Sequence, residues 1–382
     1  MSTVLTPATT EELCEVVAEA ARRGNELRVR GGGSKDSIGA PTPEVPILDM
    51  RGFSGIVDYD PPELVLTARA GTRLAEIRDA VTGEGQMLGF DPWDHGPLFG
   101  APPGAATIGG VVAAGVAGPQ RLSLGGARDH LLGFEAVSGT GEAFKAGAKV
   151  VKNVTGFDLS KLVAGSWGRL VALTQVTLKV VPLPPARETA VLRGLDPATA
   201  VAAMTRAVGS PAGVSAAAHL PNLEGRPATL FRLDGFPESV AARRKQLAAV
   251  LAELGPAEVL NDDTGEALWE QVRTASPLPA DRPLWRIVVP ASKAPGMVGA
   301  LGDAEWLLDW AGGLVWAAGS TEPGVLRAAA EAAGGHATLV RADAALRARV
   351  PALHPPEPGV AALETSICRA FDPHRVFDCG RF

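Results

Sequence analysis

The stretch Leu27-Arg28-Val29-Arg30-Gly31-Gly32-Gly33-Ser34-Lys35 places three consecutive glycines directly after a short strand pattern. Glycines have no Cβ, so this loop can adopt positive φ angles and approach a ligand closely. Successive N–H groups in such a loop form a concave nest for anionic oxygens, and Lys35 adds a positive charge. The pattern lacks the Gly-Lys-Ser/Thr ending of a P-loop and the G-x-G-x-x-G fingerprint of a Rossmann fold. The stretch suits a pyrophosphate, and a glycine-rich turn without a ligand is the alternative that it leaves open.

Length and composition limit the classes of protein to which the chain can belong. The chain has 382 residues, enough for two or three domains with full cores. A net charge of −6 and a pI near 5.6 argue against a nucleic-acid partner. We expect neither a membrane-spanning segment nor a secretory leader, because no apolar run is long enough and the N-terminus lacks a basic region. The three widely spaced cysteines indicate a reducing cytoplasm, and without a C-x-x-C pair we expect no metal site: Cys14, Cys368 and Cys379.

The first 85 residues predict two strand–turn–helix units. Thr9 and Glu12 form a capping box, apolar residues follow at helical spacing, and Gly24 ends the helix. The strand at 27–30 then leads into the glycine loop. Residues 63–70 predict a second strand, which a turn joins to an amphipathic helix. This opening predicts an α+β or α/β fold.

Residues 96–118 are almost all small, which is typical of backbone packed against a bulky partner such as a cofactor or another helix. Residues 131–142 predict a strand and hairpin turn, and residues 170–181 predict a further strand. The segment Pro182-Leu183-Pro184-Pro185 then marks a domain boundary. From 186 to about 345, strands alternate with helical patterns, which predicts a ferredoxin-like α+β domain. We expect no long internal repeat.

Six motifs occur in an order that resembles one family. They are Gly31–Lys35, Ala106-Thr107-Ile108-Gly109-Gly110, Gly125-Gly126-Ala127-Arg128-Asp129-His130-Leu131-Leu132-Gly133, Lys152-Asn153-Val154-Thr155-Gly156-Phe157-Asp158, Gly165-Ser166-Trp167-Gly168, and Phe371-Asp372-Pro373 with Gly380-Arg381. Each is weak alone, and their order and spacing are specific. Together they resemble FAD-binding proteins of the vanillyl-alcohol oxidase and para-cresol methylhydroxylase (PCMH) superfamily. Within it, the chain is most similar to glycolate oxidase subunits.

The resemblance implies an α+β fold with a two-subdomain PCMH-type FAD-binding domain and a ferredoxin-like cap domain. It places the FAD-binding domain at 1–182, the cap at 183–345, and a C-terminal segment at 346–382 that returns to the FAD domain near the flavin. It also implies that FAD lies against a set of small, polar or apolar residues: Gly31, Gly32, Gly33, Ser34, Lys35, Thr107, Gly109, Gly110, Ala113, Gly115, Gly118 and Leu173.

This chain departs from the family pattern in two places. Many relatives hold FAD covalently through a histidine in the pyrophosphate loop, and Ser34-Lys35 stands there instead, which predicts non-covalent FAD. The family's terminal Asn-Pro-Gly-Arg is here Asp378-Cys379-Gly380-Arg381, so contacts from the tail to the flavin are not assumed. For the loop itself, we expect Gly32→Val to block FAD binding and leave the fold largely intact, because a β-branched residue strains a positive φ and occupies the space of the ligand.

The sequence identifies no catalytic residue. Oxidation of a 2-hydroxy acid needs a base for the hydroxyl and a cation for the carboxylate. Catalytic subunits among the relatives carry paired histidines in the cap, but the six histidines here form no H-x-x-H or H-x-x-x-H, so a local metal site is not expected: His95, His130, His219, His336, His354 and His374. His219 lies where the cap's metal motif is expected, and a structural role is favoured for it. His95 and His130 flank the predicted flavin region and are candidates for the base. Arg121 and Arg128 are candidate carboxylate ligands, with solvated arginines as the alternative. Asp129 and Lys152 are equally consistent with a site or with a surface turn.

We therefore expect an FAD-binding subunit of a glycolate oxidase (glycolate dehydrogenase) complex. It would support oxidation of glycolate to glyoxylate by relaying electrons or by stabilising the complex. The resemblance implies a catalytic flavoprotein subunit and an iron–sulfur subunit as partners, in the cytoplasm, with any attachment to the inner membrane made through them. Two alternatives remain: a self-sufficient FAD-dependent 2-hydroxy-acid dehydrogenase, and a non-catalytic scaffold with a vestigial FAD site.

Overall fold

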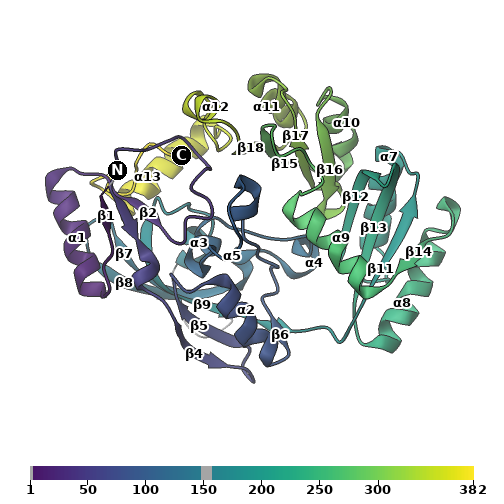
Figure 1. The fold of residues 1–382 in the computed structure, drawn as a ribbon, viewed down its shortest axis with the longest axis horizontal. Coiled ribbons are helices and arrows are strands. Elements are labelled where there is room, and N and C mark those ends of the chain that lie inside the picture. Colours follow the sequence, from purple (N-terminus) through teal and green to yellow (C-terminus); the bar gives the residue numbers. More distant parts are fainter. Residues whose placement is uncertain (1–2, 148–156) are drawn as a thin grey trace. The chain divides into compact units, whose positions relative to one another are not determined.

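A computed structural model describes residues 3–147 and 157–382, and the chain forms two compact units, each with its own core (Figure 1). The first unit comprises residues 1–117, 125–183 and 355–382, and the second comprises 118–124 and 184–354. The passage at 183–184 falls within the proline-rich boundary expected from the sequence. No helix of the described part has the length and apolar character needed to cross a membrane.

Two short stretches pack differently from the expected division, and hydrogen bonds explain both. Residues 118–124 belong to the second unit, where the carbonyl of Gly118 accepts the indole N–H of Trp310 at 3.0 Å. Residues 346–354 also belong there, because the amide of Leu339 donates to the carbonyl of Ala352 at 2.8 Å. The C-terminal segment that returns to the first unit therefore begins at 355 and not at 346.

The first unit contains two larger sheets, as expected for two α+β subdomains. A three-stranded parallel sheet has the order β1 (Val4–Leu5), β3 (Ile47–Asp49), β2 (Arg28–Arg30). A five-stranded antiparallel sheet has the order β4 (Ile56–Asp60), β5 (Val65–Arg69), β9 (Val171–Lys179), β7 (Leu131–Ser138), β8 (Ala143–Gly147). A short antiparallel pair joins β6 (Gln86–Met87) to β10 (Val181–Pro182).

Helix α1 (Thr10–Arg23) links these sheets through one buried face. The hydroxyl of Thr9 accepts the amide of Glu12 at 3.2 Å, and Gly24 ends the helix at φ +66°. The apolar face of α1 packs in one core with residues of both sheets and of the C-terminal tail: Leu13, Val17, Ala20, Leu27, Leu48, Val137, Ala172, Val376 and Phe377. The remaining helices of this unit are α2 (Leu74–Gly83), α3 (Ile108–Ala113), α5 (Ala127–His130), α6 (Leu159–Val163) and α13 (Pro358–Phe371).

The second unit is built on an eight-stranded antiparallel sheet of order β14-β11-β13-β12-β16-β17-β15-β18. Its first half has the β-α-β-β-α-β order of a ferredoxin-like fold: β11 (Ala186–Arg193), α7 (Pro197–Val208), β12 (Ala216–Leu223), β13 (Arg226–Gly235), α8 (Pro237–Val250), β14 (Glu258–Leu260). Its second half has the same order: β15 (Leu284–Val288), α10 (Ala294–Gly299), β16 (Glu305–Asp309), β17 (Leu314–Ala318), α11 (Pro323–Ala332), β18 (His336–Arg341). The ferredoxin-like cap is therefore a tandem pair, joined where His219 of β12 pairs with Leu308 of β16.

The expectation of no long internal repeat is wrong for this unit. The two halves share the same order of helices and strands and the same strand pairing. Across the sheet, the second half has the reverse strand order of the first. Helices α7, α8, α10 and α11 contribute to one core against one face of the sheet, which includes Phe231, Trp285 and Ile287. Side chains alternate along a strand, so Arg286, between Trp285 and Ile287, points to the opposite face. Helix α9 (Asp262–Thr274) connects the two halves.

Candidate functional site

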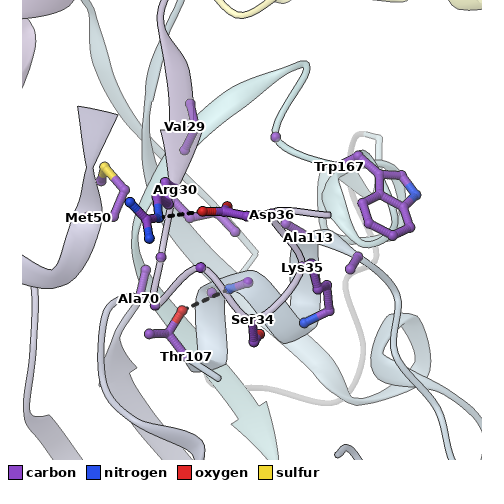
Figure 2. Close-up of a pocket in the computed structure, with 18 of the residues that line it drawn as sticks. Val29, Arg30, Ser34, Lys35, Asp36, Met50, Ala70, Thr107, Ala113 and Trp167 are labelled. Atoms are coloured by element: carbon purple, nitrogen blue, oxygen red, sulfur yellow. Dashed lines mark hydrogen bonds and ion pairs between the residues drawn. The ribbon is translucent and has the colours of Figure 1, made fainter. Parts of the chain in front are cut away.

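One pocket of the first unit brings together most of the residues predicted to hold the cofactor (Figure 2). Its empty volume is about 730 Å³, part of which is open to solvent. It is formed by the glycine loop after β2, the start of α3, and strand β9. Ten of the twelve predicted residues line it: Gly31, Gly32, Gly33, Ser34, Lys35, Thr107, Gly109, Gly110, Ala113 and Leu173.

The glycine loop is a turn whose own backbone leaves a row of amides free. The amide of Asp36 donates to the carbonyl of Gly33 and that of Ile38 to the carbonyl of Lys35, each at 3.0 Å. Among the hydrogen bonds between described residues, none uses an amide of residues 32–35 as its donor. Residues 32–35 line the pocket, so their amides are candidate donors of a nest for anionic oxygens.

The loop requires glycine because it packs directly on the segment before α3. A Cβ on Gly31 would lie 2.2 Å from Oγ1 of Thr107, and a Cβ on Gly32 would lie 1.6 Å from the carbonyl oxygen of Ala105. The positive φ belongs to Gly33, at +81°, and not to Gly32. The positive-φ reason given for the Gly32→Val expectation is therefore wrong: any side chain at Gly32 would push against the backbone of Ala105 and disturb the loop itself.

Helix α3 supplies a bare backbone wall. Thr107 caps it, accepting the amide of Gly110 at 3.4 Å, as the dashed line from Thr107 in Figure 2 marks. Gly109 packs on β5, where its amide donates to the carbonyl of Ala70 at 2.7 Å and a Cβ would lie 2.7 Å from the Cβ of Ala70. A Cβ on Gly110 would meet only Oγ1 of Thr107, at 3.2 Å, so this position borders open space.

The charged groups of the pocket are mostly positive. Arg30 pairs with Asp36, with 2.9 Å between Nε and Oδ2 (Figure 2). The pKa of Lys35 is lowered to about 8, chiefly by burial; the charge of Asp94 opposes this shift and the positive charge of Arg381 adds to it. A cation held in this way is stabilised by an anion, which a pyrophosphate would supply.

The sequence analysis missed ten lining residues. Trp167 and Arg381 belong to family motifs, yet neither was assigned to the cofactor. Arg381 donates from Nε to the carbonyl of Ile38 at 2.7 Å and from Nη2 to the carbonyl of Lys35, so the C-terminal tail holds the glycine loop. The ring of Trp167 lies 4.8 Å from that of Phe382. Arg30, Asp36 and Ala114 adjoin assigned positions in sequence, which is the signal that could have found them. Five further missed residues adjoin no assigned position, although Gly168 belongs to a family motif: Val29, Met50, Ala70, Gly168 and Val171.

Of four other predicted positions, three are described and none of these three lines the pocket. Gly115, at φ +62°, faces Gly165 and is outside the pocket lining. Gly118 belongs to the second unit. Asp129 accepts the amide of Gly126 at 2.8 Å, which assigns it to a turn. Lys152 lies outside the described residues.

None of the described histidines lines this pocket. His95 stacks on Trp93 at 3.7 Å between ring centroids, and His130 contacts the carbonyl of Lys179 through Nδ1 at 3.1 Å. His219 is buried, its Nδ1 is 2.9 Å from Oγ1 of Thr229, and burial lowers its pKa to about 4. The described residues contain no group of three or more His, Cys, Asp or Glu side chains arranged to hold a metal ion.

Comparison with known proteins shows the family of the chain. A family model described as an FAD binding domain matches residues 1–147. The glycolate oxidase subunit GlcE of Escherichia coli (strain K12) is 34% identical over 382 residues, covering 97% of this chain and 96% of that protein. The glycolate oxidase subunit GlcD of Bacillus subtilis (strain 168) is 28% identical over 187 residues, 49% of this chain and 38% of that protein. The solved structure of p-cresol methylhydroxylase with substrate bound superposes with a TM-score of 0.74 at 15% identity, covering 99% of this chain and 88% of that one.

Proposed function

Because this chain belongs to the family of the glycolate oxidase subunit GlcE, FAD-linked oxidoreductases with an FAD-binding domain of the PCMH type, we propose that it is the E-type subunit of a glycolate oxidase complex. In this role it holds FAD without a covalent bond and supports the oxidation of glycolate to glyoxylate. Its partners are a catalytic flavoprotein subunit, similar to GlcD, and an iron–sulfur subunit. The observation that carries the proposal is the pocket formed by the glycine loop, α3 and β9.

The residues present fit an FAD pyrophosphate. Gly31 and Gly32 let the loop backbone pack on Thr107 and Ala105 at the edge of the pocket. The amides of residues 32–35 have no donor role among the described residues. Lys35 adds a cation whose lowered pKa an anion would restore. Gly110 and Ala113 leave room beside the helix, and Leu173 adds an apolar surface on β9. FAD supplies a two-electron acceptor when it is bound.

The lining argues for electron relay or stabilisation of the complex, and against independent turnover. Its ionisable side chains are Arg30, Lys35, Asp36 and Arg381, and Asp36 is paired with Arg30. Among the described residues, neither a histidine nor an unpaired carboxylate lines this pocket, so the pocket itself supplies no base for the proton of a substrate hydroxyl. Proton removal is therefore assigned to the catalytic partner.

Absorbance spectroscopy of the purified chain tests the proposal. We expect a visible flavin band that ultrafiltration removes after the protein is denatured. Glycolate should bleach this band only when the catalytic partner is present. Absence of flavin would favour the scaffold alternative, and bleaching without a partner would favour a self-sufficient dehydrogenase. Flavin that stays with the denatured polypeptide would contradict the non-covalent assignment.

A further inference from the structure

Two arginines of the second unit stack on one tryptophan. The guanidinium carbon of Arg121 lies 4.8 Å from the ring centroid of Trp310, and that of Arg286 lies 4.9 Å from the same centroid. The two cations are therefore at most about 10 Å apart, on residues separated by more than 160 positions in sequence. Stacking of this kind holds a guanidinium by its face and leaves its N–H edges free.

Neither guanidinium has a carboxylate partner in the described part of the chain, where no hydrogen bond or ion pair is formed by either side chain. Another arginine of this unit shows the contrast. Arg232 is buried and satisfied, with Nε 3.1 Å from Asp234 and Nη2 2.6 Å from Glu266. A partly buried arginine without such a partner is unusual, because desolvating a charge is costly unless an opposite charge compensates it.

The surroundings of Arg286 carry excess positive charge. Burial and the charge of Arg121 lower the pKa of Arg286 to about 10, and Asp309 opposes them. Asp309 is itself engaged, since its carboxylate accepts the backbone amide of Trp310 at 2.7 Å. Burial and the charge of Arg286 also lower the pKa of His336, which keeps that imidazole neutral near pH 7. An anion placed here would relieve the repulsion.

The ring that both arginines contact is held in place by a strained turn. Trp310 has φ 51° and Ala311 has φ 54°, so two consecutive residues with side chains adopt the left-handed region. The indole N–H donates to the carbonyl of Gly118 at 3.0 Å, in the same stretch that carries Arg121. Strain of this kind persists only where surrounding contacts over-determine it, and it concentrates at functional sites.

We propose that Arg121 and Arg286, positioned by Trp310, form a carboxylate-binding site for a small 2-hydroxy acid. The presence of an anion site follows from the unpartnered cations, whereas the choice of a 2-hydroxy acid rests on the proposed function. The N–H edges of each guanidinium match the two oxygens of a carboxylate, and two guanidiniums beside one ring would fix its position. Arg128, the other sequence candidate, belongs to the first unit.

Titration calorimetry of glycolate into the full chain tests the site. We expect saturable binding, and Arg121→Gln should raise the dissociation constant roughly 10-fold or more through loss of a charged hydrogen bond. Arg121 is exposed, so this variant should fold. Arg286→Gln should have a comparable effect, and Arg121→Lys should recover only part of the affinity because it restores the charge without the planar donor edge. Arg206→Gln is the matched control, since Arg206 belongs to the same unit, is 52% exposed and pairs with Glu253.

The outcomes separate the site from the subunit's function. Glycolate binding that is absent from the full chain, or unchanged in Arg121→Gln, would overturn the proposal even if the chain holds FAD normally. Conversely, a chain without FAD whose glycolate binding depends on both arginines would support the site and contradict the proposed function. If Arg121→Gln weakened capture of the catalytic subunit and left glycolate affinity unchanged, the arginines would bind an acidic protein surface and the proposal would fail.

Discussion

Lys35 is the residue whose charge we expect to control affinity for the cofactor. Its pKa is lowered from 10.5 to about 8, so it is protonated near neutral pH and neutral in mild alkali. An anionic pyrophosphate favours the protonated form, so FAD affinity should fall as the pH rises through about 8. We expect the dissociation constant for FAD to rise roughly 10-fold once the charge is lost. Quenching of FAD fluorescence from about pH 7 to about pH 9.5 measures this change.

Two substitutions assign that pH dependence to Lys35. Lys35→Arg keeps the charge through this range and should flatten the profile, and Lys35→Met should bind weakly at every pH without a step. The stability of the unloaded protein should change in the opposite direction. The unfolded chain retains the proton up to about 10.5 and the folded chain only to about 8, so stability should rise between these values. If FAD affinity or stability of Lys35→Met still changed with pH by the full amount, another group would be responsible.

Gly110 and Gly109 form a matched pair that separates binding from folding. A Cβ on Gly110 meets only Oγ1 of Thr107 and borders the pocket, so Gly110→Ala should weaken FAD binding while leaving stability unchanged or raised by up to about 1 kcal/mol. A Cβ on Gly109 would press on Ala70, so Gly109→Ala should destabilise the fold by about 1–3 kcal/mol. Urea unfolding and flavin content measure the two effects. Full flavin content in Gly110→Ala would place the cofactor away from α3.

The C-terminal tail contacts the residues of the pocket through its last two residues. Arg381 donates to the carbonyls of Lys35 and Ile38, and Phe382 packs on Trp167. The core contacts of the tail lie upstream, at Val376 and Phe377. Deleting residues 381–382 should therefore accelerate FAD release several-fold with little change in the unfolding midpoint. Stopped-flow exchange against a flavin trap measures the release, and Phe382→Ala alone should have the smaller effect because the loop carbonyls keep their donor.

Several elements were predictable because their signals are local. The capping box at Thr9 and the stop at Gly24 bound α1, and the hairpin turn after residue 138 joins β7 to β8. The strand at 27–30 and its glycine loop were found in the same way. The tandem ferredoxin-like arrangement was not predictable, because β12 and β16 meet through strand pairing between residues about 90 positions apart in sequence. No local pattern encodes that pairing.

The whole molecule has two units with separate cores, which predicts two thermal transitions. One core is made only of residues of the first unit and the other only of residues between 190 and 339. FAD at 100 times its dissociation constant should stabilise the first unit by about 2.7 kcal/mol, which is roughly 5–10 °C in its transition. Calorimetry with and without FAD measures this. The second transition should not move, and an equal shift of both would indicate that the units unfold together.

The sequence by itself determined the class of cofactor site and ten of the residues that line the pocket. Glycine content, small-residue runs and motif order can be recognised in short stretches of sequence, because they reflect the backbone geometry that each stretch adopts. Only the tertiary structure decided which distant side chains complete the pocket, such as Trp167 and Arg381, and which glycine carries the positive φ. It also brought Arg121 and Arg286 to one indole ring. Such convergence depends on sheet order and chain return, which long-range packing fixes and no short stretch of sequence specifies.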